Sequence, residues 1–146
     1  MAGPWLRPRV PVVWGSEGIA EAAAQRWKTQ CNENAKAPAF WGVLPEVDHN
    51  EVEGWSANEG VPFGLVVLRH RGEHPRTEAR VRATLDAVAA AGLEATQAEA
   101  ASDSPACALF SLVMLGDYVS TYLALLRGVD PTPVPVLTSV KERLQS

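Results

Sequence analysis

A carboxylate and an imidazole lie in two polar stretches of this sequence, 16 positions apart (49 − 33 = 16). Glu33 lies in the run Asn32–Lys36, and His49 is followed by Asn50 and Glu51. A carboxylate and an imidazole are the groups that move protons on and off a small polar substrate near neutral pH. An isolated Glu or His is, however, more often a solvated surface residue. The pattern alone leaves both interpretations open.

The composition is that of a soluble globular domain. The chain has 146 residues, which fits one domain, and 47% of them are hydrophobic, which is enough for a core. The net charge is −4 with a pI near 5.4, and no basic block is present. Nucleic acid and anionic membranes are therefore not expected partners.

The two cysteines and the first residues indicate in which cell compartment the protein is expected. Cys31 and Cys107 have no spacing typical of a metal site, so reduced thiols are expected. Residues 1–20 contain no long apolar stretch of the kind found in signal peptides. A cytoplasmic protein is the expectation.

Hydrophobic runs alternate with helix-favouring runs along the chain. The run at residues 10–14 is short and β-branched, and a Gly-rich turn at residues 15–18 separates it from a helix expected to end near Lys36. The other expected strands cover residues 39–44, 63–68 and 93–98, and the other expected helices cover residues 51–55, 76–91, 106–126 and 134–144.

This alternation predicts an α/β fold, with a parallel sheet covered by helices on both faces. Ligands of such folds bind beyond the carboxyl ends of the strands. Ser16 and the loop at residues 46–50 both follow strands, so both are expected at that edge. Residues 1–9 are predicted to be a loose, Pro-rich lead-in, and residues 10–146 a single domain.

The run at residues 106–126 has the length and apolar character of a membrane span. Asp117 and its neighbours interrupt it, and an Asp in the middle of a bilayer costs several kcal/mol. A helix buried in a soluble core is the better prediction.

The run His70-Arg71-Gly72-Glu73-His74 matches a zinc-binding pattern. That pattern requires a helix to bring both histidines to one side of the metal. Here it directly follows a predicted strand and ends at Pro75, so no metal site is expected.

Four longer runs, at residues 26–39, 44–51, 115–120 and 129–134, resemble the C-terminal sugar isomerase (SIS) domain of bacterial and archaeal bifunctional phosphoglucose/phosphomannose isomerases. The resemblance extends from about Val10 to Leu144. It implies a three-layer α/β/α sandwich of flavodoxin-like type. It also implies reversible aldose–ketose isomerisation of hexose 6-phosphates without a metal or nucleotide cofactor.

The same resemblance implies roles for single residues. Glu33 matches the base that moves a proton between C1 and C2 of the sugar. His49 matches a residue that assists ring opening from the neighbouring subunit. Lys141, which alone would be an exposed helix residue, matches a lysine acting at the ring oxygen and the reacting hydroxyl. The side chains expected to bind substrate are Ser16, Asn32 and Asn50.

The chain also departs from the family. Complete enzymes carry two SIS domains, and the phosphate-binding loop and an enediolate-steadying Arg belong to the N-terminal one, which this chain lacks. We therefore expect a homodimer that needs an N-terminal SIS domain and is weakly active or inactive alone. The alternatives are a non-catalytic module that binds sugar phosphates and a dimerisation module.

Overall fold

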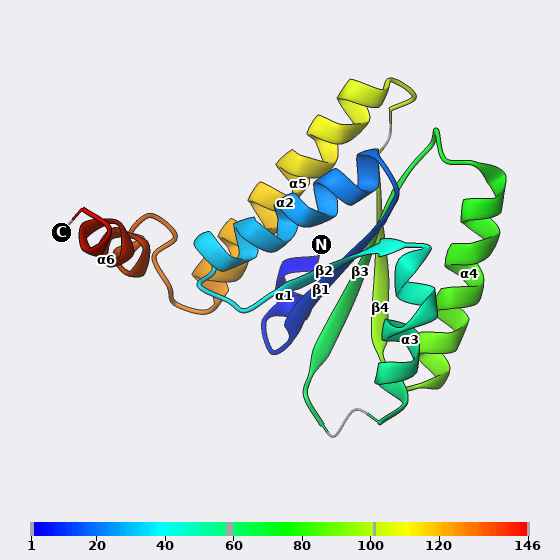
Figure 1. Cartoon of the computed structure of the whole chain (residues 1–146), viewed down its shortest axis with the longest axis horizontal. Helices are drawn as coiled ribbons and strands as arrows, with labels where there is room; N and C mark the ends of the chain where they lie inside the picture. The colour runs from blue at the N-terminus through cyan, green and yellow to red at the C-terminus, as the bar shows by residue number, and fades with distance from the viewer. Residues whose placement is uncertain (1, 58–59, 101, 146) are drawn as a thin grey trace.

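A parallel sheet lies at the centre of the computed structural model, which describes residues 2–57, 60–100 and 102–145 (Figure 1). Within these residues it has four strands in the order β2-β1-β3-β4, and every neighbouring pair is parallel. The strands are β1 (Val10–Ser16), β2 (Phe40–Leu44), β3 (Phe63–His70) and β4 (Glu94–Ala100).

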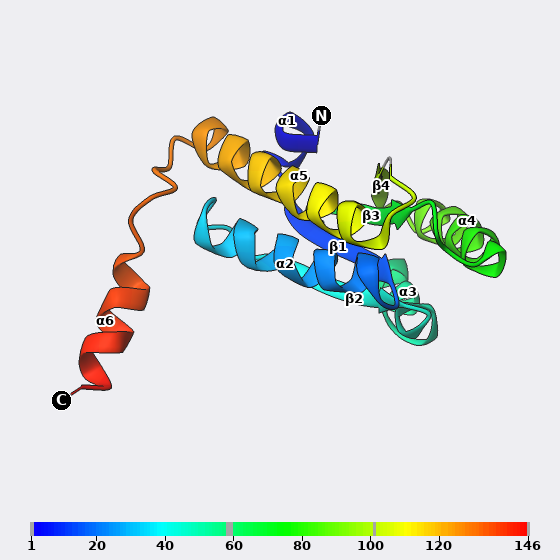
Figure 2. The same cartoon turned by 90° about the horizontal axis from the view of Figure 1, so that it is seen from above.

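Helices connect the strands and cover both faces of the sheet (Figures 1 and 2). They are α1 (Ala2–Leu6), α2 (Ile19–Glu33), the 3₁₀ turn η1 (Glu46–His49), α3 (Glu51–Gly54), the 3₁₀ turn η2 (Trp55–Ala57), α4 (Pro75–Ala90), α5 (Pro105–Leu126) and α6 (Pro135–Arg143). Helices α2 and α5 lie on one face, and α3 and α4 lie on the other. The predicted three-layer α/β/α sandwich is confirmed.

The two faces of the sheet form two separate cores. Successive residues of a strand point to opposite faces, so Val13 packs beneath α2 and α5 while Val12 and Trp14 pack beneath α4. These three side chains are at most 1% exposed. Because β1 is buried on both faces, its sequence is a continuous apolar run rather than an alternating one.

The direction of α2 separates the predicted site residues. Strand β1 ends at Ser16, and α2 then runs back toward the opposite edge of the sheet. At about 1.5 Å per residue, its 15 residues span about 22 Å. Glu33 therefore lies at the edge where the strands begin, whereas Ser16 and His49 lie at the edge where the strands end.

Helices α2 and α5 approach each other closely at Gly116. A Cβ at this position would lie 2.3 Å from Oε1 of Gln30 and 2.5 Å from Cδ1 of Trp27, both on α2. The Trp27 Nε1 donates a hydrogen bond of 2.7 Å to the carbonyl oxygen of Leu112. A side chain at residue 116 would push the helices apart, so glycine is required there.

Helix α5 is buried along only one of its faces. The side facing α2 includes Leu112, Val119 and Leu123, which are at most 6% exposed. The opposite side leaves Phe110 69% exposed and Tyr118 57% exposed. The helix is long and apolar enough to cross a membrane by length and composition. The prediction of a core helix is right for one face and wrong for the other.

Two expectations about chain segments differ from the structure. Residues 1–9 were expected to be a loose lead-in, but α1 forms there and Leu6 is 1% exposed within the core. Arg127 holds this segment by donating from Nη2 to the carbonyl oxygen of Arg9 at 2.8 Å. Helix α2 ends at Glu33 rather than near Lys36, because Lys36 has a left-handed backbone (φ 51°) that a helix cannot contain.

Helix α6 stands away from the rest of the molecule (Figure 2). None of its residues, all of which the structure describes, is buried. The segment at residues 127–134 joins it to α5, and the Nζ of Lys36 donates to the carbonyl oxygen of Pro131 at 3.1 Å. The predicted last helix is therefore present, with none of its residues buried.

Candidate active site

The 30–37 segment, at the end of α2, is fixed to α5 by side-chain amides. The Gln30 Nε2 donates to Oδ1 of Asp117 and, at 3.3 Å, to the carbonyl oxygen of Val113. The Asn34 Nδ2 donates to Oγ of Ser120 at 2.9 Å. The hydrogen bonds from Gln30 and Asn34 hold Glu33 from both sides without contacting its carboxylate.

Two further bonds close the turn after Glu33. The Lys36 Nζ donates to the backbone carbonyl oxygen of Glu33. The Asn32 Nδ2 donates to the carbonyl oxygen of Ala37 at 2.7 Å. The amide of Asn32, expected to bind substrate, thus has a role in fixing the turn.

Glu33 itself is exposed, and its carboxylate has no hydrogen bond or ion pair among the residues that the structure describes. A free carboxylate on a tightly held backbone is the arrangement that a general base needs. The backbone sets its position, and the oxygens stay available to a substrate.

The 45–51 segment, which carries His49, is fixed to α4 instead. The Asp48 carboxylate accepts a hydrogen bond from Nη1 of Arg80 at 2.8 Å and another from Oγ1 of Thr84 at 2.7 Å. Val47 is 1% exposed and packs beneath α4. The two residues before it, Val47 and Asp48, face the body of the domain, whereas His49 is exposed, and its imidazole has no partner in the described part of the chain.

Asn50 and Ser16, the other predicted substrate-binding residues, have partners of their own. Asn50 caps α3: its Oδ1 accepts from the backbone N–H of Glu51 at 2.6 Å, and its Nδ2 donates to Glu46 at 2.9 Å. Ser16 is 7% exposed and donates from Oγ to Oε1 of Glu73 at 2.7 Å. A substrate-binding role for these residues and for Asn32 stays a prediction.

One contact of the 45–51 segment was not predicted. The Trp14 Nε1 donates to Oε2 of Glu51 at 3.1 Å, which ties the segment to the centre of the sheet. Burial raises the pKa of Glu51 above its usual value, and the hydrogen bond from Trp14 lowers it by a smaller amount. The sequence feature that could have pointed to a role for Glu51 was its position directly after His49 and Asn50.

Cys31 precedes the Asn-Glu-Asn run, but it is not a nucleophile. The side chain is 1% exposed. Burial raises the pKa of its thiol to about 11, against a smaller lowering by the Arg127 charge. Since the thiolate is the reactive form, this thiol is inert at neutral pH.

The His70–His74 run forms the turn between β3 and α4 rather than a helix. Nδ1 of His70 accepts from the N–H of Gly72 at 3.2 Å, and Nδ1 of His74 caps α4 by accepting from Arg76 at 3.1 Å. Glu73 is paired with Arg69 at 2.5 Å. The part of the chain that the structure describes contains no group of three or more metal-binding side chains suited to an ion.

The three predicted catalytic residues therefore occupy three places. Glu33 lies at the edge where the strands begin, and His49 at the edge where they end. Lys141 is exposed on α6, which stands off the body on the side where α2 ends. No hydrogen bond or ion pair joins these three residues within the described parts of the chain. A single chain therefore does not bring Glu33, His49 and Lys141 together in one site.

Comparison with known sequences gives long matches to sugar-phosphate enzymes. The bifunctional phosphoglucose/phosphomannose isomerase of Caldicellulosiruptor bescii is 36% identical over 138 residues, and that of Aquifex aeolicus is 37% identical over 137. Each match covers 93% of this chain but only 41% and 42% of the relative. The chain thus spans less than half the length of these curated relatives.

Solved structures with the same fold carry related names. A glucose-6-phosphate isomerase like protein from Thermus thermophilus superposes with a TM-score of 0.75 at 18% identity, covering 96% of this chain and 45% of that one. The C-terminal domain of glucosamine-fructose-6-phosphate aminotransferase from Francisella tularensis gives 0.64 at 13%, covering 88% and 39%. Identities this low establish the fold alone.

The family itself is established by a match over nearly the whole chain. Residues 3–144 match the family described as "Bacterial phospho-glucose isomerase C-terminal SIS domain". Three of the runs that carried the resemblance contain residues that fix Glu33 against α5 or His49 against α4, among them Asn34, Asp117 and Asp48. This chain belongs to the family of bacterial phosphoglucose isomerase C-terminal SIS domains.

Proposed function

We propose that this chain supplies the proton-transfer residues of an isomerase that interconverts glucose 6-phosphate or mannose 6-phosphate with fructose 6-phosphate. The observation that carries the proposal is Glu33: an exposed, unpaired carboxylate on a backbone fixed by Asn32, Asn34 and Lys36. The names of the relatives supply the substrate class. The reaction would belong to cytoplasmic sugar-phosphate metabolism, as in glycolysis and gluconeogenesis.

The proposed chemistry is proton transfer through an enediolate. In the open-chain aldose, Glu33 removes the proton from C2, and the electrons of the C2–H bond form a C1=C2 double bond. The aldehyde oxygen then carries the negative charge, which a nearby cation stabilises. Return of the proton from Glu33 to C1, with transfer of the C2 hydroxyl proton to the negatively charged C1 oxygen, gives the ketose. No electron leaves the substrate.

His49 has the chemistry required to open the sugar ring. An imidazole can donate a proton to the ring oxygen near neutral pH. Within one chain His49 and Glu33 lie at opposite edges of the sheet. A site that uses both residues must therefore be shared between two copies of the chain, which supports a homodimer.

Lys141 supplies the remaining cation. It lies in the last turn of α6, where a positive charge suits the helix dipole. Helix α6 stands off the rest of the chain (Figure 2). In this proposal, association with another chain or domain covers α6 and brings Lys141 beside the substrate.

The isolated chain is expected to turn over slowly or not at all. It spans less than half of its relatives, and the phosphate-binding loop is proposed to lie in the rest. Binding energy from a remote phosphate supports catalysis at the reacting carbons, so loss of that loop lowers the rate as well as the affinity.

A mixing assay tests the proposal. The chain would be combined with the N-terminal part of the Caldicellulosiruptor bescii relative, and conversion of fructose 6-phosphate to glucose 6-phosphate would be measured. Activity should appear on mixing and be lost with Glu33→Gln. The control is Glu53→Gln, which changes another exposed glutamate and should be neutral. Activity that survives Glu33→Gln rules out the assigned base.

A second candidate is an association module without catalysis. The exposed apolar face of α5 favours it, because such a surface marks a contact site. Binding of sugar phosphate by the mixture without turnover, or association without sugar-phosphate binding, would support this alternative.

A further inference from the structure

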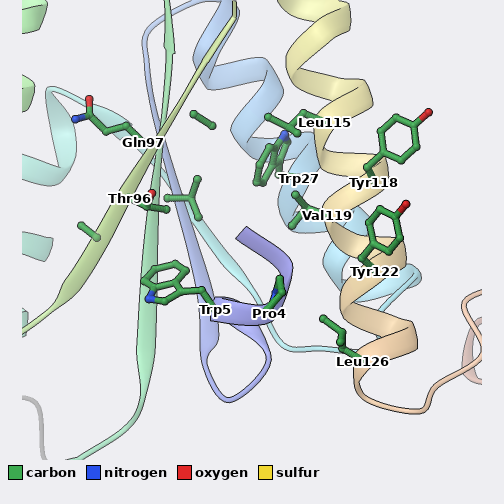
Figure 3. A pocket seen from close by; sticks show the side chains of 13 residues that line it. Pro4, Trp5, Trp27, Thr96, Gln97, Leu115, Tyr118, Val119, Tyr122 and Leu126 are labelled. Carbon is green, nitrogen blue, oxygen red and sulfur yellow. The ribbon is translucent and has the colours of Figure 1, made fainter. Parts of the chain in front are cut away.

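The 127–134 segment decides where α6 can carry Lys141. None of the residues of α6, all of which the structure describes, is buried, so packing does not place this helix (Figure 2). The start of the segment is fixed, because α5 ends at Leu126 beside α1 (Figure 3), and Nε of Arg7 donates to the carbonyl oxygen of Leu126 at 2.9 Å. The freedom of Lys141 therefore depends on what holds the chain after Leu126.

The first half of the segment is shaped by local bonds. Gly128 has a left-handed backbone (φ 70°), as is common where a helix ends. The N–H of Val129 donates to the carbonyl oxygen of Ala124 at 2.9 Å, and Oδ1 of Asp130 accepts from the N–H of Thr132 at 2.9 Å. These bonds shape the turn after α5, and none of them attaches the segment to α2.

Lys36 makes that attachment. Its Nζ donates to the carbonyl oxygen of Pro131, 95 positions further along the chain, at 3.1 Å. The same Nζ donates to the carbonyl oxygen of Glu33. One ammonium group therefore joins the 30–37 segment, which carries the proposed base, to the 127–134 segment, which leads to the proposed cation.

The backbone of Lys36 draws attention to this side chain. Its φ of 51° lies in the left-handed region, which glycine and asparagine adopt more readily than lysine does. The turn after Glu33 needs only that backbone, and glycine or asparagine would supply it at a lower cost. A residue held in an unfavourable backbone conformation points to a function of its side chain. The side chain of Lys36 is the one that bonds to Pro131.

Prolines make the chain beyond this bond stiff. Pro131, Pro133 and Pro135 alternate with Thr132 and Val134. Proline fixes its own φ and favours an extended conformation in the residue before it, so such a run acts as a semi-rigid spacer. A fixed carbonyl at Pro131 therefore sets the direction in which the spacer leaves the body, and with it the direction of α6.

The reach of Lys141 gives the size of the effect. From Pro131 to Pro135, where α6 begins, the chain spans at most about 14 Å. Lys141 lies about 9 Å further along the helix. Counted from Leu126 instead, the chain up to Pro135 spans at most about 31 Å. Holding Pro131 therefore lowers the largest reach of Lys141 from about 40 Å to about 23 Å, which reduces the accessible volume about fivefold.

We infer that Lys36 is a positioning residue: it holds the carbonyl of Pro131 and thereby keeps Lys141 near the Glu33 end of α2. The inference rests on the proposed roles of Glu33 and Lys141 in the isomerase. Lys36 touches no reacting atom and acts only through Lys141. Its bond limits where α6 can go, and association with another chain or domain then fixes the helix. A confined ammonium group meets the developing negative charge more often than a freely moving one does.

A distance measurement on the chain alone tests the contact. Nitroxide labels are attached at Arg26→Cys on α2 and at Val136→Cys at the start of α6, in a chain with Cys107→Ser. Cys31 is 1% exposed and stays unlabelled. Double electron–electron resonance gives the distribution of distances between the labels. Lys36→Asn suits the left-handed backbone but is too short to make the bond, so it should widen this distribution about twofold.

Two variants serve as controls. Lys36→Arg keeps a long cationic side chain on the same backbone and should keep the narrow distribution. Lys28→Gln changes another lysine, on α2, and should also leave the distribution unchanged. Circular dichroism shows whether each variant keeps its fold, and Lys36→Gly replaces Lys36→Asn if the latter unfolds. A distribution that the loss of the Lys36 ammonium leaves unchanged in a folded chain overturns the inference.

Kinetics separate positioning from a purely structural role. In the mixture with the N-terminal part of the Caldicellulosiruptor bescii relative, Lys36→Asn should lower kcat about fivefold and leave KM for fructose 6-phosphate unchanged. Lys36→Arg should restore most of kcat. In a chain that already carries Lys141→Met, Lys36→Asn should have no further effect, because its effect passes through Lys141. A structural role predicts equal losses in the two chains, and that result would refute positioning.

The outcome is separable from that of the proposed function. A distribution that widens in Lys36→Asn, together with a mixture that shows no isomerase activity, supports the hold of Lys36 on α6 and counts against the function. Activity on mixing that is insensitive to Lys36→Asn supports the function and refutes the positioning role.

Discussion

Among the described residues, the 30–37 segment leaves the carboxylate of Glu33 unpaired and the 45–51 segment leaves the imidazole of His49 unpaired, but the two segments are held by different forces. Glu33 sits on a backbone fixed against a helix largely by side-chain amides and packing, through Gln30, Asn34 and the close contact at Gly116, with Asp117 as one charged acceptor. His49 sits on a backbone fixed largely by charge, through Asp48 and Glu51.

This difference indicates how each segment should respond to salt, to pH and to added side-chain volume. Packing and neutral hydrogen bonds respond weakly to salt and pH but strongly to added volume. Ion pairs at the surface respond to salt, and a half-buried carboxylate responds to pH. The position of Glu33 should therefore depend less on salt and pH than the position of His49.

The sharpest test asks whether the two segments serve one site across two chains. Glu33→Gln and His49→Gln, each combined with an N-terminal domain, should lower isomerase activity roughly 10²–10⁴-fold. In a two-fold dimer, mixing the two variants restores one intact site in each mixed dimer, or about a quarter of the full activity. Activity is measured after the variants exchange subunits. No recovery on mixing would show that Glu33 and His49 do not act across a dimer contact.

Added volume at Gly116 should distort the 30–37 segment most. In Gly116→Ala, the new methyl meets Gln30 and Trp27, so we expect a loss of about 1–3 kcal/mol in the free energy of unfolding. Urea denaturation measures it. Gly54→Ala is the control, because a Cβ there meets nothing within 4 Å, and its effect should stay within about 0.5 kcal/mol. Equal effects of the two changes would contradict the close contact.

Loss of the Asp48 charge should affect the 45–51 segment in a salt-dependent way. Asp48→Asn removes the ion pair with Arg80, whose side chain is 47% exposed, so the expected cost is under about 1 kcal/mol. The difference from the unaltered chain should shrink in about 1 M salt. Glu78→Gln breaks the more exposed pair with Arg82 and serves as the control. A cost that salt does not change would mean that Thr84 alone fixes Asp48.

The smallest expected effect concerns Glu51 and pH. Because folding raises the pKa of this carboxyl, its contribution to stability is complete below the usual pKa and is lost as the pH rises through the raised value. Glu51→Gln removes this loss and keeps an acceptor for Trp14. The melting temperature of the variant, relative to the unaltered chain, should therefore be higher at pH 7 than at pH 4. The opposite trend would mean that the hydrogen bond from Trp14 outweighs burial.

The sequence predicted the elements well, because each has a strong local signal. The turn at Gly18 and the proline at the start of α5 mark boundaries within a few residues of those observed. Glu33 and His49 are both exposed, as isolated Glu and His residues usually are.

The partners of the polar residues could not be predicted in the same way. Ser16 bonds to Glu73, and Asn34 bonds to Ser120, 86 positions away. Such pairs are set by how the layers stack, which no local pattern encodes. The exposed face of α5 was missed for a related reason: apolar residues all round a helix indicate burial, but the covering surface can belong to another domain.

Helix α6 has a consequence for when the protein can work. A nine-residue helix without a buried face is marginal in water, because short isolated helices lack enough internal bonds to offset the entropy of ordering. Lys141 is therefore held in place only once a neighbour covers α6. Under the proposed role of Lys141, protein concentration would then act as an on–off control, because unassembled subunits would lack a positioned ammonium group.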